Sequence, residues 1–430
     1  MNGRCGFSCR SPMPQTRMSC SGATMSQAGT SGSRHRIFIS FRMFSPYIMA
    51  RLNAAADVAE VVAVEGSHRT STYAWEPRAG EERFLRETMY TDQPIEDVPA
   101  DRIWADTQRV LDRHQPDIVA LGGWNFAEAL AALDWAVTNR RPRIMFSEST
   151  AHDAPRSWWR EWPKARIVAS CQAAMVGGQD HVDYLARLGF DPARVTIGYN
   201  AVDNDYFARG AEAVRQNATD VRARQGLPDR FFLASCRFIP IKNLVRLLDA
   251  YALYRDGSNG KPWNLVIIGD GEQRPVLEAR ISELGLDRSV TLPGFRQIEE
   301  LPDFYGLAGA FVHVSLIEPW GLVVNEAQAS GLPVIASDRC GCTRELIRDG
   351  INGFAVDPTD TSGIADRMQR IAADPQLRDR MTAGARTSVA DYGPARFADG
   401  LDRAIRIAEA APLTGNNPVD RWIRRRVGLR

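Results

Sequence analysis

The chain has 430 residues, a length that predicts two or three domains, each large enough to bury its own core. Its 53 Lys and Arg and 52 Asp and Glu leave a net charge of +1, which excludes a protein drawn onto nucleic acid by overall charge. Apolar residues make up 44% of the chain without any run of about 18, so general disorder and a membrane span are also excluded. Seven scattered cysteines show no disulfide pattern and favour a cytoplasmic protein.

Residues 1–35 are expected to form a disordered leader. They hold several arginines, many Ser and Gly residues and no acid, and they lack the apolar core of a secretory signal. A transit peptide has a similar composition, and a true start at Met18 or Met25 is a further interpretation.

Residues 36–205 are predicted to form the first of two α/β domains. Short apolar runs predict strands at 36–40, 58–64, 118–121, 143–146 and 175–177. Helical patterns lie between them, for example at 47–56, 101–114 and 126–139. Strands that alternate with helices of this length are typical of βαβ units, so a parallel sheet covered on both faces is expected.

Residues 206–388 repeat this pattern after a polar stretch, 209–229, that is expected to separate the halves. Strands are predicted at 231–236, 263–268, 290–292, 311–314, 333–336 and 353–356, and helices at 243–254, 272–284, 301–307 and after Gly321. A helix at 389–411 is expected to cross back onto the first domain, before a basic tail at 412–430. The predicted fold class is α/β, with two doubly wound domains facing each other across a cleft.

The most informative segment surrounds the start of the helix after Gly321. Free N–H groups at a helix start bind anions, and glycine lets a ligand approach the backbone closely. Glu318 precedes this helix and Glu326 lies within it, so both carboxylates are placed to accept hydrogen bonds from hydroxyls of one elongated ligand. A surface Glu318 and a salt-bridged or capping Glu326 are the alternative.

With its neighbours, this segment resembles the retaining family 4 glycosyltransferases, which have the two-domain GT-B fold. The stretch Glu-Pro-Trp-Gly-Leu-x3-Glu-Ala at 318–327 resembles the E-x7-E signature of that family. Arg237 and Lys242 lie five residues apart, as in its G-R-L-x3-K-G segment. Other blocks match in the family's order, at 199–207, 266–271, 292–295, 331–337, 345–347 and 349–353. The resemblance covers residues 195–390 and implies a GT-B enzyme.

The resemblance also implies roles for residues on the donor side. Arg237 and Lys242 would bind the diphosphate of a nucleotide sugar and meet the charge on the departing phosphate. Glu318 would bind a hydroxyl of the donor sugar, and Glu326 the hydroxyls of the ribose. Further donor contacts are expected from Gly321, Leu322, Trp320, Phe295 and Arg296. The nucleoside diphosphate sugar is then a co-substrate, and neither a metal nor a cofactor is expected.

The first half departs from the family pattern, because the aromatic stretch 41–47 replaces the Gly-rich loop of many relatives. Relatives often place a histidine near the cleft in mid-domain. The candidate here is His152, after the strand at 143–146, and a loop histidine that faces solvent is the alternative. Other candidates for acceptor contact also follow strands of the first half: Glu148, Asp153, Arg156 and Trp124.

Two segments mix tryptophan with basic residues. For 156–164 the alternatives are a membrane interface, stacking against a sugar acceptor, and packing into the interdomain wall. For 421–426 they are contact with anionic lipid and a solvated, disordered end. Peripheral contact with the inner face of a membrane therefore stays open.

The sequence thus predicts a metal-independent, retaining, hexosyltransferase-like glycosyltransferase. It would move a sugar from a nucleoside diphosphate sugar to a hydroxyl of a glycan or glycolipid, in polysaccharide biosynthesis of a bacterial cell envelope. A sugar-nucleotide epimerase of the same fold and a non-catalytic nucleotide-sugar-binding module are the alternatives.

Overall fold

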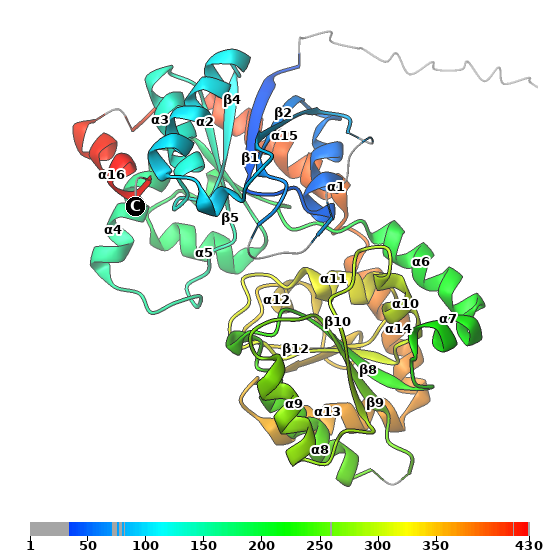
Figure 1. Cartoon of the computed structure of the whole chain (residues 1–430). Coiled ribbons are helices and arrows are strands. Elements are labelled where there is room, and N and C mark those ends of the chain that lie inside the picture. The colour runs from blue at the N-terminus through cyan, green and yellow to red at the C-terminus, as the bar shows by residue number, and fades with distance from the viewer. Residues whose placement is uncertain are drawn as a thin grey trace, which may run out of the picture. The chain divides into compact units, whose positions relative to one another are not determined.

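Two parallel β-sheets organise the part of the chain that the structure describes (Figure 1). The structure is a computed structural model that describes residues 34–70, 75–76, 80, 82–258, 260–415 and 417–428. The predicted leader, 1–35, lies outside these ranges except for its last two residues.

The first sheet has seven strands in the order β3-β2-β1-β4-β5-β6-β7. In chain order they are β1 Arg36–Phe41, β2 Glu60–Ser67, β3 Leu85–Tyr90, β4 Ile118–Gly122, β5 Arg143–Ser147, β6 Ala173–Val176 and β7 Val195–Ile197. The helices of this half are α1 Pro46–Ala55, α2 Ala100–His114, α3 Ala127–Thr138, α4 Trp158–Val168 and α5 Gln179–Arg187, with short 3₁₀ turns at Ile95–Asp97 and Pro192–Arg194. The order reverses between β1 and β4, the switch point at which such sheets bind ligands.

The second sheet has six strands in the order β10-β9-β8-β11-β12-β13. They are β8 Phe231–Ser235, β9 Asn264–Ile268, β10 Val290–Gly294, β11 Ala310–His313, β12 Val334–Ser337 and β13 Gly353–Val356. The helices are α6 Asn204–Gln216, α7 Ala218–Gln225, α8 Leu244–Asp256, α9 Arg274–Glu283, α10 Leu301–Leu307, α11 Leu322–Ala329, α12 Thr343–Leu346, α13 Thr361–Ala373 and α14 Pro375–Val389, with a 3₁₀ turn at Pro240–Lys242. Here the switch point lies between β8 and β11.

Central strands of both sheets are mostly apolar, as expected where helices cover both faces of a sheet. Ile37, Phe38 and Ile39 of β1 are fully buried, and so are Phe231 and Phe232 of β8. Parallel sheets of this kind require such continuous apolar runs. The predicted α/β class with two doubly wound halves is confirmed, while the domain boundaries at 36–205 and 206–388 stay predictions.

Several elements differ from the sequence-based expectation, and neither edge strand of the first sheet, β3 or β7, was predicted. The edge strand β3 was not predicted, because its sequence is polar and Arg86 and Glu87 form ion pairs there. The polar stretch 209–229 is not a plain separator: it belongs largely to α6 and α7, and α6 buries Phe207 and Val214. An amphipathic surface helix is polar overall, so composition alone hid it.

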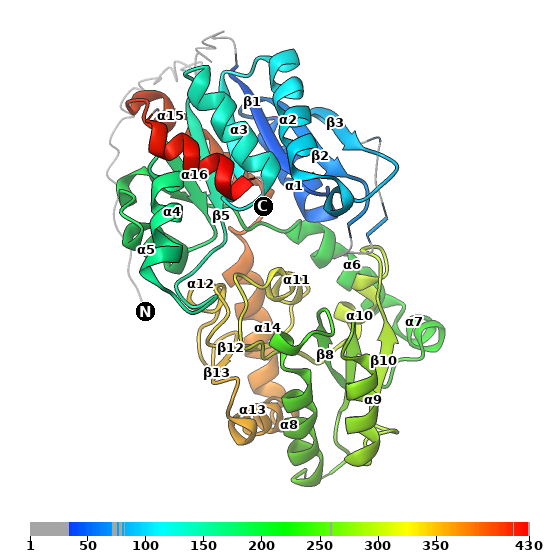
Figure 2. The same ribbon diagram turned by 60° about the vertical axis from the view of Figure 1, so that its left-hand side comes forward.

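The C-terminal region returns to the first half, as predicted. Helix α15, Pro394–Ala410, contacts α1 and β6, and helix α16, Pro418–Gly428, contacts α3 and α4 (Figure 2). The expectation of a solvated tail is wrong, because Arg424 in α16 donates to Asp134 Oδ1 at 2.9 Å and both side chains are buried. None of the helices in the described ranges is long and apolar enough to cross a membrane.

Two chain segments connect the halves and bind each other. The backbone N–H of Val202 donates to the carbonyl of Tyr392 at 3.3 Å. The side-chain amide of Asn204 donates to the carbonyl of Val389 at 2.7 Å. The outgoing and returning segments are therefore held side by side where they pass between the two sheets.

Candidate functional site

Glu318 stands at the centre of a polar cluster between β11 and α11. Its Oε2 accepts hydrogen bonds from Lys242 Nζ and, at 2.8 Å, from His313 Nε2. Ser315 Oγ lies 3.4 Å from the same oxygen. Lys242 follows β8 and His313 ends β11, so the cluster forms at the carboxyl ends of the two strands that flank the switch point.

The cluster keeps the Glu318 carboxylate ionised. Burial alone raises the pKa of this carboxyl group, but the hydrogen bond from His313 and the charge of Lys242 outweigh burial and lower the pKa to about 2. The Lys242 and Glu318 side chains are each only 12% exposed. Glu318 therefore carries a negative charge throughout the neutral pH range.

The backbone directly after Glu318 leads into α11 through a left-handed glycine. Gly321 has a backbone φ of +97°, which residues other than glycine adopt only with strain. A Cβ added at this position would lie 3.3 Å from Glu318 Cγ. Leu322 is the first residue of α11, and the free N–H groups of this turn carry the positive end of the helix dipole. This geometry suits an anionic or hydroxylated ligand near Glu318.

Arg237 and Lys242 are brought to the same end of the second sheet, as their spacing predicted. Arg237 follows β8 and is half-buried, and it lies near enough to the Cys236 thiol for its charge to act on that group together with Lys242. Their roles toward a diphosphate stay predictions.

Glu326 is fully enclosed within α11 and is contacted from both halves. Tyr305 Oη donates to Glu326 Oε2 at 2.7 Å, and Tyr47 from α1 also forms a hydrogen bond to the carboxyl group. Burial raises the pKa of Glu326 from 4.5 to about 7, although both tyrosine hydrogen bonds oppose this shift. The alternative of a surface Glu318 with a salt-bridged Glu326 does not hold, because Glu318 is 12% exposed and the partners of Glu326 are tyrosines.

The Glu326→Gln variant is expected to be more stable than the wild-type protein at pH 8. Because its pKa is higher in the folded protein, Glu326 binds a proton more tightly there than in the unfolded chain. The protonated Glu326 therefore contributes its full share to the free energy of unfolding below pH 4.5, and this contribution is lost as the pH rises to about 7. The loss amounts to about 3 kcal/mol in the free energy of unfolding. Urea denaturation from pH 5 to 8 should give a flatter pH dependence for the variant, and equal slopes would contradict the assigned burial.

Aromatic residues of the first half lie against the predicted donor side. The Trp75 ring packs edge-on against Phe295 at 5.2 Å between centroids and against Tyr47 at 6.0 Å. The stretch 41–47 was predicted to replace a Gly-rich loop. Its last residue is Tyr47, whose side chain contacts Glu326. Arg296 pairs with Glu300 at 3.3 Å, and the roles of Phe295 and Arg296 toward a donor stay predictions.

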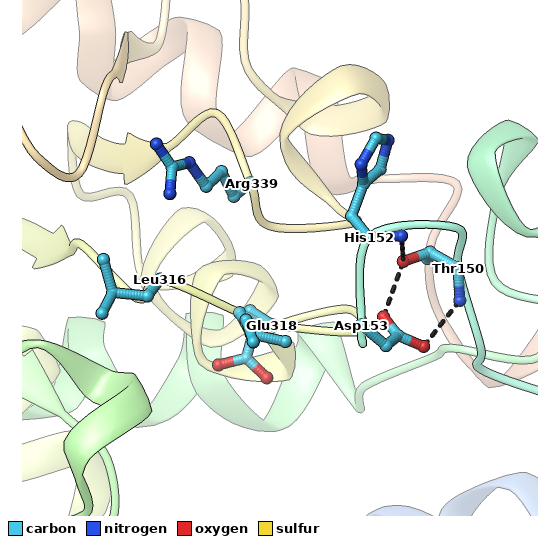
Figure 3. Close-up of a pocket in the computed structure, with 7 residues that line it drawn as sticks. Thr150, His152, Asp153, Leu316, Glu318 and Arg339 are labelled. Carbon is cyan, nitrogen blue, oxygen red and sulfur yellow. Dashed lines mark hydrogen bonds between the residues drawn. The ribbon is translucent and has the colours of Figure 1, made fainter. Parts of the chain in front are cut away.

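A cavity of about 430 Å³ lies beside Glu318 and is lined by residues of both halves (Figure 3). His152 and Asp153 contribute from the first half, and Glu318 and Arg339 from the second. The His152 imidazole is exposed and points away from Asp153 and Glu318. The structure therefore places His152 in the cavity wall, and its participation in chemistry stays a prediction.

The other acceptor-side candidates have different surroundings. Arg156 Nη1 donates to Tyr184 Oη at 2.8 Å, and its guanidinium lies over the Tyr184 ring. Trp124 is buried in the core of the first half against the same tyrosine. Glu148 is exposed. Arg156 and Trp124 thus stabilise the first half, and the structure gives no support for direct acceptor contact by the Trp124 side chain.

Trp320 also differs from the expectation that it contacts the donor. Its indole is 2% exposed, packs between His181 and Tyr392, and donates from Nε1 to Asn325 Oδ1 at 2.9 Å. The Trp320 side chain is surrounded by other protein atoms, and its contacts hold the loop that carries Glu318 in place.

Sequence reasoning missed several residues that build this site. His313 could have been found, because it ends a buried parallel strand five residues before Glu318. His181 could not: its Nε2 lies 3.0 Å from the Pro319 carbonyl only because α5 of the first half meets this loop. Tyr47 and Tyr305 likewise converge on Glu326 through tertiary packing alone. Among the described residues, no group of three His, Cys, Asp or Glu side chains could hold a metal ion.

Comparison with known proteins finds a family match in the second half of the chain. Residues 218–388 match the family described as "Glycosyl transferases group 1". This matched stretch is less than half of the chain, and it makes the second half similar to that family. The matched residues include Arg237, Lys242, Glu318 and Glu326, so the polar cluster around Glu318 lies within the matched stretch.

Two proteins with known activities are moderately similar to this chain. An alpha-D-kanosaminyltransferase of Streptomyces kanamyceticus is 31% identical over 249 residues, which are 57% of this chain and 61% of that protein. A D-inositol 3-phosphate glycosyltransferase of Frankia alni is 29% identical over 339 residues, 73% of this chain and 81% of that protein. The match to the first of these relatives thus spans less than two thirds of its length.

A solved structure supports the fold assignment. The Anabaena protein HepE in complex with UDP-glucose superposes with a TM-score of 0.65 at 19% identity, over 87% of this chain and 99% of HepE. The chain therefore has the GT-B fold predicted from its sequence.

Proposed function

We propose that this protein is a retaining glycosyltransferase that moves a sugar from a nucleoside diphosphate sugar to a hydroxyl of a glycan or glycolipid. The observation that carries the proposal is the ionised Glu318 held by Lys242 and His313 at the start of α11, beside a cavity lined from both halves. HepE is described with UDP-glucose, which favours a UDP-sugar as the donor here.

In the proposed reaction, the bond between the anomeric carbon and the diphosphate oxygen breaks as the acceptor oxygen attacks from the same face. Arg237 and Lys242 meet the charge that develops on the departing phosphate, and each charged hydrogen bond contributes about 1.5–3 kcal/mol. The N–H groups after Gly321 add to this stabilisation. The departing phosphate itself takes the proton of the acceptor hydroxyl.

Glu318 has a positioning role toward the donor sugar in this scheme. Its charge is fixed, so it accepts hydrogen bonds from sugar hydroxyls and does not act as a general acid near neutral pH. When the donor diphosphate is present, the Lys242 ammonium can turn from Glu318 to the phosphate, because Lys242 and Glu318 both lie at the carboxyl ends of β8 and β11.

Calorimetric titration with UDP, GDP and ADP tests the proposal. We expect UDP to bind selectively, and we expect the Glu326→Ala variant to lose this binding while the matched surface variant Glu272→Ala keeps it. Glu326 is buried in α11 and Glu272 is exposed before α9, so only the first change alters the predicted ribose contact. Absence of binding by any of the three nucleotides would overturn the donor assignment.

Product analysis separates transfer from the alternatives. A transferase releases UDP from a UDP-sugar when an acceptor is present. A sugar-nucleotide epimerase would convert the sugar without releasing UDP, and a binding module would do neither.

A further inference from the structure

Four tryptophan side chains are exposed on two adjacent helices of the first half. Trp158, Trp159 and Trp162 of α4 are 82%, 58% and 48% exposed, and Trp422 of α16 is 63% exposed. The expectation that the α4 tryptophans pack into an interdomain wall is therefore wrong. Large aromatic side chains left in water are unusual on a monomeric protein and mark an interaction surface.

The two helices form one unit. Arg166 Nε of α4 donates to Asp420 Oδ1 of α16 at 2.7 Å. Their inner residues Ile167, Val168 and Ile423 belong to the same core cluster. Because both helices pack onto one core, their exposed residues face away from that core. We call these exposed residues of α4 and α16 the tryptophan face.

Exposed charge on the tryptophan face is positive. Arg160, Arg421 and Arg426 are exposed, and the Arg160 guanidinium lies over the Trp159 ring. The acidic residues of the two helices are turned inward. Glu161 accepts hydrogen bonds from Lys164 at 2.8 Å and from Tyr184 at 2.7 Å, and Asp420 is buried beside Arg166.

We propose that the tryptophan face docks on the surface of an anionic lipid bilayer. Tryptophan rings favour the headgroup region, where their apolar body and polar N–H are both accommodated, and arginines bind anionic headgroups. The residues that line the described cavity beside Glu318 include none of this face, so the tryptophans do not belong to that concave ligand site.

Docking would also bring the acceptor side of the candidate site toward the lipid. Helix α4 begins five residues after Asp153, which lines the cavity. This step rests on the proposed function and favours an acceptor carried by a lipid. Lipid binding itself does not depend on catalysis, so the two proposals can fail separately.

Co-sedimentation with vesicles tests the docking. The full chain is mixed with vesicles of phosphatidylcholine alone or of phosphatidylcholine with phosphatidylglycerol. We expect binding to the anionic vesicles, weaker binding to the neutral ones, and weakening by salt. Neutralising Arg421 or Arg426 to Gln is expected to weaken anionic binding about fivefold each.

A triple variant, Trp158→Ser/Trp159→Ser/Trp162→Ser, is expected to lose vesicle binding and the accompanying blue shift of tryptophan emission. The matched control Leu253→Ser/Val276→Ser/Ile351→Ser removes exposed apolar groups from the second half and should bind as the wild type does. Circular dichroism verifies that each variant folds.

The docking proposal would be overturned if the wild-type protein did not bind vesicles, or if the triple tryptophan variant bound them as well as the wild type does. It would also be overturned if the tryptophan face bound a soluble glycan or a second copy of this chain in place of lipid. Vesicle binding without nucleotide binding would retain the docking and reject the proposed function.

Discussion

The Glu318→Gln variant is expected to fold and to bind UDP, yet to lose about 10²- to 10³-fold in turnover of sugar transfer. Glutamine keeps the shape of the side chain but removes the charge that holds Lys242 and His313 in place. The amide also offers a weaker acceptor to the donor sugar. Because Glu318 is assigned to the sugar and not to the nucleotide, UDP affinity should change far less than turnover.

Steady-state kinetics with a UDP-sugar, together with calorimetry on UDP, check this result. The control is Glu272→Gln, which removes an exposed carboxylate from the same half of the chain. Thermal unfolding shows whether the variant remains folded. Turnover equal to that of the wild-type protein would reject the role of Glu318.

The Lys242→Met variant is expected to lose both stability and donor binding. Removing this ammonium leaves the enclosed Glu318 carboxylate with His313 as its remaining basic partner, and breaking such a pair costs about 3 kcal/mol in the free energy of unfolding. Loss of one charged hydrogen bond to the diphosphate should weaken UDP binding by about 1.5–3 kcal/mol, a tenfold to hundredfold change in Kd.

A double variant separates these two effects. Lys242→Met/Glu318→Leu removes both members of the pair, so most of the lost stability should return while sugar transfer stays absent. Lys261, one of the three lysines of the chain, is exposed, and Lys261→Met serves as the matched control. Recovery of transfer in the double variant would show that the pair is structural and not part of the donor site.

Local sequence pattern was sufficient for most of the fold. The continuous apolar runs of β1 and β8 require burial on both faces, and their alternation with helices leaves a parallel sheet as the solution. The apolar pattern did not predict elements whose sequences are mostly polar. Strand β3 lies at the sheet edge and satisfies its charges by ion pairs, and α6 shows only a narrow apolar face to α10.

The position of the expected donor-side residues in the fold was also predictable, because they are close in sequence or lie at the ends of recognisable strands; their roles toward a donor stay predictions. Glu318, Gly321 and Glu326 fall within nine residues of one another, and Arg237 and Lys242 follow a single strand. Their spacing is set by one loop and one helix start. What each residue contacts was not predictable from that spacing.

The sequence by itself determined the two-sheet class and the identity of the charged groups and indicated the family resemblance, since these depend on local pattern and short spacing. Only the tertiary structure decided their environment. Contacts of His313 and Lys242 give Glu318 a low pKa, whereas burial gives Glu326 a high one against the opposing hydrogen bonds of Tyr47 and Tyr305. Packing likewise buries Trp320 and leaves Trp158 in water, because burial depends on which surfaces meet and not on residue type.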